Sequence, residues 1–549
     1  MIVKEPFAMS SPVRRRVAAL IAGLLVAATF WSVAAPANAA GYVAISGAGS
    51  TWSQNALDQW RRNVDQFGIK VNYSGTGSSD GRNQFRNGTV DFAVTEIPYG
   101  IKDNNVVDQP PSRKFSYLPI VAGGTSLMYN LTIGGKRVTN LRLSGPTISK
   151  MFTGAITTWD DAAIKKDNPG LALPARRIVP VVRSDGSGST AQFTAWMAAT
   201  QRATWDSYCA KAGRPTPCGT TSFYPVVAGK GFVAQSGSLG VSGYVSQTQN
   251  VGTITYVEYS YALNRGFPVV KVLNKAGYYV EPTPNNTAVG LLGAKVNSNP
   301  SSPAYLTADL SGVYSNPDKR TYPLSSYSYM VVPNKVEGTF SANKGRTLGA
   351  FAYYFLCEGQ KQAPVLGYSP LPINLVKAGL DQVRKIPGVE AQSVDIKKCN
   401  NPTFSADGTN LLAKNAPQPS ECDRIGVTQC ATGTGGAKQP TTVKSGTTGA
   451  NGQPAGASGG TAGTGGTGGT TAGGGATAAG GGGAVDPDTG QALSNDGGNA
   501  TVAASAISLS SGTGWGVQQT SMVFAALLLI AIMFAPPMLA RAITRRRPS

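Results

Sequence analysis

Three glycine-rich turns carry the residues in this sequence that are best suited to hold an anion. The turns span 47–52, 75–79 and 183–189; each contains Ser or Thr and is followed by a helical pattern. The start of a helix leaves backbone N–H groups unpaired and carries about half a positive charge. Glycine lets the backbone approach a ligand closely, and a hydroxyl adds a donor. One such turn is weak evidence because Ser and Thr are common helix N-caps, but three together predict an anion site.

Arg183 adds a guanidinium group to the start of the third turn. This planar group can donate two N–H groups to two oxygens of the same anion. The turn therefore favours a tetrahedral oxyanion as the ligand.

Catalytic chemistry has little support in the residues. The sequence contains no histidine, which excludes Ser-His-Asp and Cys-His triads, histidine-ligated zinc and histidine pH switches. Gly229-Lys230 is followed by Gly231, so it is not a Walker A loop. The GxSxG pattern at 77–81 occurs again at 456–460 and has no histidine to serve it. We expect no enzymatic activity, no catalytic residue, no metal and no cofactor.

The net charge is +20, from 48 Lys and Arg against 28 Asp and Glu, in a chain of 549 residues. Part of the excess lies in arginine clusters beside two apolar runs, and the rest is scattered. Because there is no long basic block and no zinc-finger or RNA-reading motif, we expect no nucleic-acid partner.

Both ends of the chain carry targeting signals. Residues 1–39 are typical of a signal peptide, with a small-x-small site before a mature start at Ala40, although an uncleaved anchor is the alternative. Residues 522–540 form an uncharged apolar stretch of 19 residues, close to the length of a transmembrane helix. The arginines in 541–549 predict a basic cytoplasmic tail. We expect a single-pass protein of the cell membrane whose body is extracellular.

Six cysteines agree with an oxidising compartment. Several pairings are possible, and we favour the sequential one because its first and last pairs close short loops. The pairs are then Cys209/Cys218, Cys357/Cys399 and Cys422/Cys430.

Residues 431–515 consist mainly of Gly, Thr, Ala and Ser and have almost no large apolar side chain. Such a segment cannot bury enough surface to offset its chain entropy, so we expect a flexible, disordered tether. The folded body then spans 40–430.

Within the body, short apolar runs alternate with helical patterns. The runs predict strands at 42–45, 71–73, 90–94 and 178–182. The helix after the first turn should bury Leu57, Trp60, Val64 and Phe67, which follow one another at helical spacing. A strand, a glycine-rich turn and a helix in repeated order indicate an α/β fold.

Five segments in this order resemble one known family; they are 47–52, 77–79, 90–96, 183–189 and 256–261. The family is the phosphate-binding protein of the bacterial ABC-type phosphate uptake system. The resemblance covers about 41–333 and is weaker from there to 430.

This resemblance implies a two-lobed, periplasmic-binding-protein-like fold with a hinge. Lobe 1 would span about 40–120 and 325–430, and lobe 2 about 121–324. The chain would cross between the lobes near 118–122 and 324–330.

The resemblance also implies a set of phosphate-binding residues. These are Thr51, Trp52, Ser78, Glu96, Arg183, Ser187, Gly188 and Ser189. Asp185 would orient Arg183 without touching the ligand.

Two of these residues depart from the family pattern, because Trp52 replaces Phe and Glu96 replaces Asp. A carboxylate here accepts a hydrogen bond from the proton on phosphate, which sulfate lacks at neutral pH. Glu is one methylene longer, so either the pocket shifts or the ligand preference has changed. The alternative is that Glu96 is solvated at the end of a strand.

The function implied is that of a membrane-anchored extracytoplasmic protein that captures inorganic phosphate for an ABC importer. Its partners would be the ABC permease and ATPase complex, and the membrane through the C-terminal helix. The alternative is a surface-displayed protein that reuses this fold for sensing, adhesion or another oxyanion, without transport.

Overall fold

The computed structural model describes residues 41–103 and 106–443. The predicted signal peptide, transmembrane stretch and basic tail lie outside the described residues, as does the predicted tether from residue 444 onward. Within the described ranges, no helix combines the length and the apolar character needed to cross a bilayer.

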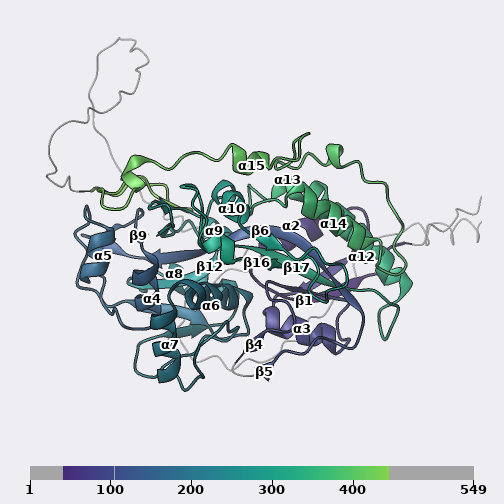
Figure 1. The fold of residues 1–549 in the computed structure, drawn as a ribbon, viewed down its shortest axis with the longest axis horizontal. Coiled ribbons are helices and arrows are strands. Elements are labelled where there is room, and N and C mark those ends of the chain that lie inside the picture. The colour runs from purple at the N-terminus through teal and green to yellow at the C-terminus, as the bar shows by residue number, and fades with distance from the viewer. Residues whose placement is uncertain (1–40, 104–105, 444–549) are drawn as a thin grey trace, which may run out of the picture. The chain divides into compact units, whose positions relative to one another are not determined.

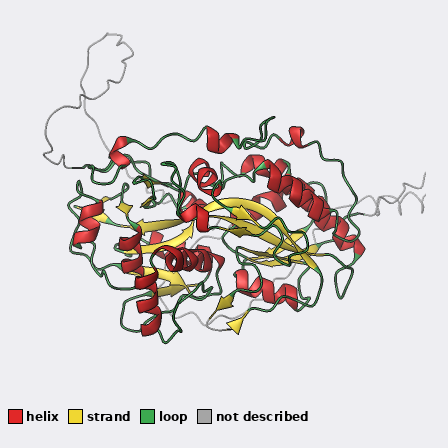
Figure 2. Cartoon of the chain, in the orientation of Figure 1, coloured by secondary structure: helices red, strands yellow, loops and turns green. Residues whose placement is uncertain are grey.

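An eight-stranded mixed sheet forms the centre of the fold, with helices packed around it (Figures 1 and 2). Its strands are β1 (Ile45–Gly49), β2 (Val71–Ser74), β3 (Phe92–Thr95), β6 (Phe115–Asn130), β10 (Val179–Arg183), β11 (Val233–Gln235), β12 (Thr253–Glu258) and β17 (Ser325–Pro333). The strand order is β11-β10-β12-β6-β17-β3-β1-β2. β1 is parallel to β2 and β3, and β10 is parallel to β11 and β12. The central strands β6 and β17 are antiparallel to their neighbours, so each lobe contributes one set of three parallel strands.

The first lobe places its helices around β1, β2 and β3. They are α2 (Gln54–Asp65), α3 (Ser78–Arg86), α12 (Ala342–Leu356), α13 (Glu358–Gln362) and α14 (Ile373–Val383). As the spacing predicts, α2 buries Leu57, Trp60 and Val64. The prediction for Phe67 is wrong: α2 ends at Asp65, Gly68 adopts a positive φ, and Phe67 is 62% exposed.

Strand β1 starts later than the sequence predicts. It covers Ile45–Gly49 instead of 42–45, so two glycines assigned to the turn belong to the strand. Gly47 pairs with Phe92 on β3, and a Cβ at Gly47 would overlap the Phe92 ring. This glycine therefore serves close packing inside the sheet rather than chain reversal.

The second lobe surrounds β10, β11 and β12 with helices. They are α4 (Gly145–Phe152), α5 (Ala162–Asp167), α6 (Gly188–Thr200), α7 (Arg202–Lys211), α8 (Gly237–Ser246) and α9 (Tyr259–Asn264). Two further helices, α10 (Pro284–Leu291) and α11 (Ser311–Tyr314), lie beside the central strands, where α10 packs on β6 and β17 and Val313 of α11 joins the core of the first lobe. Aromatic side chains fill its core; the rings of Phe193 and Tyr256 stack at 4.8 Å between centroids. Trp159 and Trp205 are fully buried in the same cluster.

Short two- and three-residue strands pair in the loops of both lobes. They are β4 (Lys102–Asp103), β5 (Val106–Val107), β7 (Thr132–Ile133), β8 (Lys136–Arg137), β9 (Arg142–Leu143), β13 (Lys271–Leu273), β14 (Tyr279–Val280), β15 (Lys295–Val296) and β16 (Ala308–Asp309).

Strands β6 and β17 form the hinge between the lobes. β6 pairs with β17 up to Gly124 and with β12 from Thr125 onward, so the first crossing lies at this step. The predicted crossing at 118–122 is a few residues early, because that part of β6 packs in the core of the first lobe. The second crossing lies between Leu324, which packs in the core of the second lobe, and Ser325, where β17 begins. This is the start of the predicted range, 324–330.

The chain after α14 passes from the first lobe to the second (Figure 1). It contains the short helices η1 (Ile396–Cys399), α15 (Leu411–Lys414) and η2 (Glu421–Asp423). Lys271 Nζ donates to Asp423 at 2.8 Å, and buried Arg142 donates to the carbonyls of Cys422 and Val427. The assignment of 325–430 to the first lobe is therefore wrong for its last part, because these contacts hold it on the second.

The three predicted disulfides are all present. The packed chain also continues past Cys430, the end of the body that the sequence predicts. Thr434 is fully buried and accepts a hydrogen bond from Val269 N at 3.1 Å. A residue from the predicted tether thus belongs to the second lobe.

Candidate anion-binding site

Both sets of parallel strands direct their carboxyl ends toward the boundary between the lobes. In the first lobe, β1 leads to Ser50, β2 leads to Ser78 at the start of α3, and β3 leads to Glu96. In the second lobe, β10 ends at Arg183 and β11 leads to Ser238 in α8. Ligands of α/β sheets commonly bind at such strand ends.

Glu96 lies at the centre of this boundary. Its side chain is buried, with 1% of the residue exposed. Both carboxyl oxygens accept from Ser50 Oγ at 2.7 Å, Oε2 accepts from Ser78 Oγ at 2.9 Å, and Oε1 accepts from Ser328 Oγ at 2.7 Å. The alternative of a solvated Glu96 is therefore wrong. We call Glu96, Ser50, Ser78 and Ser328 the Glu96 cluster.

Burial raises the pKa of the Glu96 carboxyl above its ordinary value. The hydrogen bonds from Ser328, Ser50 and Ser78 favour the ionised form and oppose part of that rise. The site thus combines an acidic group with hydroxyl donors away from bulk water.

The start of α6 brings the second lobe against this cluster. Gly188 N donates to Ser78 Oγ at 3.1 Å, and a Cβ at Gly188 would overlap Oε2 of Glu96. Ser187 caps the helix, where its Oγ accepts from Thr190 N at 3.2 Å. Ser189 is 1% exposed, and its Oγ has no hydrogen-bond partner among the described residues.

Arg183 and Asp185 form a second cluster beside the first. Arg183 Nε donates to Asp185 Oδ1 at 2.7 Å, and a second guanidinium nitrogen donates to Oδ2. Burial alone would raise the pKa of Asp185, but the hydrogen bonds and charge of Arg183 outweigh it, so this pKa lies below its ordinary value. The remaining nitrogen of Arg183 donates to Ser238 Oγ at 3.4 Å.

Thr51 and Trp52 connect the first lobe to the second. Thr51 Oγ1 lies 2.9 Å from Ser238 Oγ, and it accepts from Ser238 N at 3.1 Å. Trp52 is fully buried; its backbone N–H donates to Ser50 Oγ, and its indole donates to Thr125 Oγ1 at the hinge.

The structure therefore brings all the predicted site residues to one interlobe region, but in two hydrogen-bonded groups. Arg183 and Glu96 share no hydrogen bond. Arg183 donates to Ser238, whose hydroxyl contacts that of Thr51. Ser50, which precedes Thr51 in the sequence, donates to Glu96 and completes the link.

Further contacts hold the lobes together around this region. Ser79 N donates to Gly186 O at 3.0 Å, and Ser79 Oγ donates to Ser222 Oγ at 3.0 Å. Gln192 of α6 donates to the carbonyl of Glu96 at 2.8 Å. The described lobes thus meet in a closed arrangement.

Three residues of these clusters are missing from the predicted site. Ser238 follows a strand and a Ser-Gly turn, so the pattern of the other turns could have found it. Ser50 lies inside the first glycine-rich turn, directly before the predicted Thr51 and Trp52. Ser328 lies in the middle of β17, where no local signal marks it.

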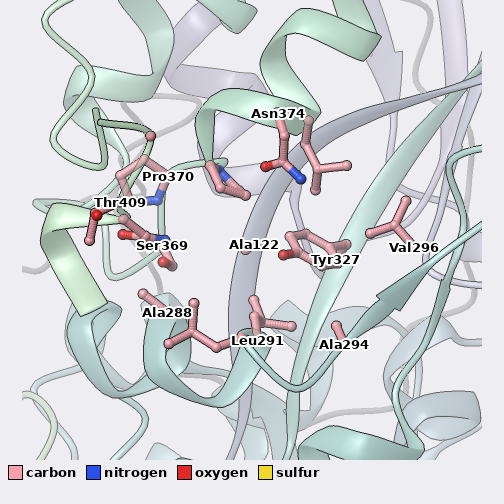
Figure 3. Close-up of a pocket in the computed structure, with 15 residues that line it drawn as sticks. Ala122, Ala288, Leu291, Ala294, Val296, Tyr327, Ser369, Pro370, Asn374 and Thr409 are labelled. Carbon is pink, nitrogen blue, oxygen red and sulfur yellow. The ribbon is translucent and has the colours of Figure 1, made fainter. Parts of the chain in front are cut away.

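A cavity of about 420 Å³ lies elsewhere, beside the hinge (Figure 3). Ala122, Tyr327, Ser369, Asn374 and Thr409 are among its lining residues, and none of the lining residues is charged. It contains no predicted site residue, and its lining does not suit an inorganic anion. Among the described residues, no group of His, Cys, Asp and Glu is arranged to hold a metal ion.

Comparison with known proteins identifies the family to which this fold belongs. A sequence model described as a PBP superfamily domain matches residues 33–358, which shows that the chain belongs to this superfamily. The phosphate-binding protein PstS of Xylella fastidiosa is 33% identical over 337 residues, covering 61% of this chain and 83% of its own. PstS of Methanocaldococcus jannaschii is 31% identical over 352 residues, covering 62% and 85%. Within the superfamily, the chain belongs to the PstS family of phosphate-binding proteins.

A solved structure of a periplasmic phosphate-binding protein bound with phosphate is also similar to this chain. It shares 18% sequence identity, with a TM-score of 0.47, over 64% of this chain and 100% of its own.

Proposed function

We propose that this chain is an extracytoplasmic binding protein that captures inorganic phosphate for an ABC importer. The observation that carries the proposal is the convergence of Ser78, Glu96 and Gly188 where the strand ends of both lobes meet. The PstS names of its relatives support phosphate as the ligand. The partners would be the permease and ATPase complex of that importer.

Phosphate would be held from both lobes. Arg183 and the start of α6 would donate from the second lobe, and the hydroxyls beside Glu96 would donate from the first. Closure of the lobes would bury the anion without any bond being made or broken, so no catalytic residue is required.

Glu96 would select phosphate over sulfate. Phosphate at neutral pH carries a proton that can be donated to a carboxylate oxygen. Sulfate has none, so its oxygen would face the acceptor with an unpaired lone pair and charge repulsion in a buried site.

The test is isothermal titration of the purified chain with phosphate and with sulfate. We expect saturable heat with phosphate and a much weaker response with sulfate. No detectable phosphate binding at millimolar concentration would contradict the proposal.

We further propose that residues 1–39 direct export, that the glycine-rich linker beyond the second lobe is a tether, and that residues 522–540 anchor the protein in the cell membrane. The motivation is the uncharged stretch between this linker and the C-terminal arginines. Membrane fractionation compares the full chain with a chain ending before residue 522. The full chain should sediment with membranes and the shortened chain should be released; release of both would contradict the anchor.

A surface-displayed protein without a transport role is the second candidate. The length of the predicted tether favours it, because delivery to a permease does not require so long a linker. Deletion of the gene separates the two proposals: a defect in phosphate uptake at low phosphate supports transport, and unchanged uptake supports the second candidate.

A further inference from the structure

The carboxyl group of Glu96 lies at the start of α6, where the proposed site would place its donors for an anion. Its Oε2 lies against the backbone of Gly188 at the start of α6, where a Cβ would overlap it. Helix N-termini with glycine at this point are positions where anions bind. The longer side chain of Glu thus reaches across the lobe boundary to the opposite helix.

The donors around the carboxyl group are those that an oxyanion would need. Ser50, Ser78 and Ser328 all direct hydroxyl hydrogen bonds to its two oxygens. Hydrogen bonds between hydroxyls and a carboxylate are stronger than those between neutral groups, so these three hydroxyls favour keeping the carboxyl group in this position. A bound phosphate would compete for the same hydroxyls.

The carboxyl group of Glu96 accepts hydrogen bonds from only some of the donors at the proposed site. Ser189 Oγ is buried without a partner among the described residues, and Arg183 is turned to Asp185 and Ser238. A buried hydroxyl without a partner costs free energy that a further oxygen atom could recover. A tetrahedral anion has four oxygens where a carboxyl group has two, so the site has donors that Glu96 does not use.

We propose that Glu96 is an internal competitor for the anion site, and that phosphate must displace its carboxyl group from Ser78 and Gly188 in order to bind. This inference rests on the proposed function. It makes Glu96 the residue that sets phosphate affinity as well as selectivity.

The experiment is equilibrium dialysis of radiolabelled inorganic phosphate against the purified full chain and three variants. Glu96→Asp draws the carboxyl group back by one methylene while keeping the acceptor. Glu96→Ala removes the competitor and the acceptor together. Glu390→Asp makes the same shortening at an exposed surface position and is the matched control.

We expect Glu96→Asp to bind phosphate at least tenfold more tightly than the unchanged chain and to keep its preference over sulfate. Glu96→Ala should also bind phosphate more tightly but should admit sulfate. Glu390→Asp should match the unchanged chain.

The outcomes separate this inference from the proposed function. Equal or weaker phosphate binding by both Glu96 variants, with clear binding by the unchanged chain, would overturn the internal competitor and leave the function standing. If neither the unchanged chain nor the folded variants bind phosphate, the proposed function fails and the inference fails with it.

Discussion

Ser328 Oγ donates a hydrogen bond of 2.7 Å to Oε1 of Glu96. Ser328 lies on β17, one of the two hinge strands, whereas Glu96 follows β3 at the lobe boundary. The hinge and the centre of the candidate site are therefore in direct contact. A change in the position of the carboxyl group would therefore break or shift a hydrogen bond to the hinge strand β17.

Ser328→Ala should lower the stability of the protein. The variant removes a buried hydrogen bond to an acidic group, which is worth about 1–3 kcal/mol. Urea unfolding measures the loss as a lower midpoint. Ser315→Ala, which removes an exposed hydroxyl, is the control and should leave the midpoint unchanged. Equal midpoints for both variants would show that the contact with Glu96 contributes nothing.

Asp185→Asn should weaken phosphate binding although Asp185 itself is not expected to touch the ligand. The carboxylate holds two nitrogens of Arg183, so the amide would leave the guanidinium less firmly placed. We expect a loss of about tenfold or more in affinity, measured by titration calorimetry. Asp381→Asn, at an exposed ion pair, is the control. Unchanged affinity in a folded Asp185→Asn protein would contradict this role for Asp185.

The contact between Thr51 and Ser238 should couple the lobes. Their hydroxyls lie 2.9 Å apart and belong to different lobes. A double-mutant cycle with Thr51→Ala and Ser238→Ala measures the coupling in phosphate affinity. We expect the two losses to be non-additive, with an interaction of about 1 kcal/mol. Strictly additive losses would mean that the hydroxyls act independently.

The strand–turn–helix pattern could be predicted because it is local. Glycine-rich turns at 47–52, 75–79 and 183–189 all lead into helices, and Thr51, Ser78 and Gly188 at these turns lie at the lobe boundary. The start of β1 could not be predicted, because the reason for glycine at position 47 is the close approach of the Phe92 ring, and Phe92 lies far along the chain. Ser328 could not be predicted for the same reason, because only the pairing of β17 with β3 brings it to Glu96.

The end of the body was also beyond prediction from local composition. Thr434 lies among glycines in the sequence, yet it is fully buried. Its hydroxyl accepts a hydrogen bond from Val269 N, and its backbone N–H donates to Thr139 O, so it is held on the second lobe. A segment that looks unable to fold by itself can add to a surface already formed by other residues.

Glu258 should make stability depend on pH. It is fully buried, Oε2 accepts from Ser260 N, and Oε1 has no partner among the described residues. Burial raises its pKa well above the ordinary value. Protonation of Glu258 therefore favours the folded state, and this stability is lost as the pH rises through the raised pKa.

Glu258→Gln tests this expectation because the amide stays neutral at every pH. The difference between the unfolding midpoints of the variant and the unchanged chain should grow in favour of the variant from pH 5 to pH 8. Glu421→Gln, at an exposed ion pair, should show no such trend. A constant difference for Glu258→Gln would mean that Glu258 is ionised in the folded state as it is in the unfolded state, so that burial does not raise its pKa.

The measurement that tests the account most directly is a crystal structure of the chain grown with phosphate. We expect phosphate between the lobes, bound by Arg183 and the start of α6, with the Glu96 carboxyl group moved away from Gly188. Phosphate bound at another place, with Glu96 still against Gly188 and hydrogen-bonded to Ser78, would contradict it.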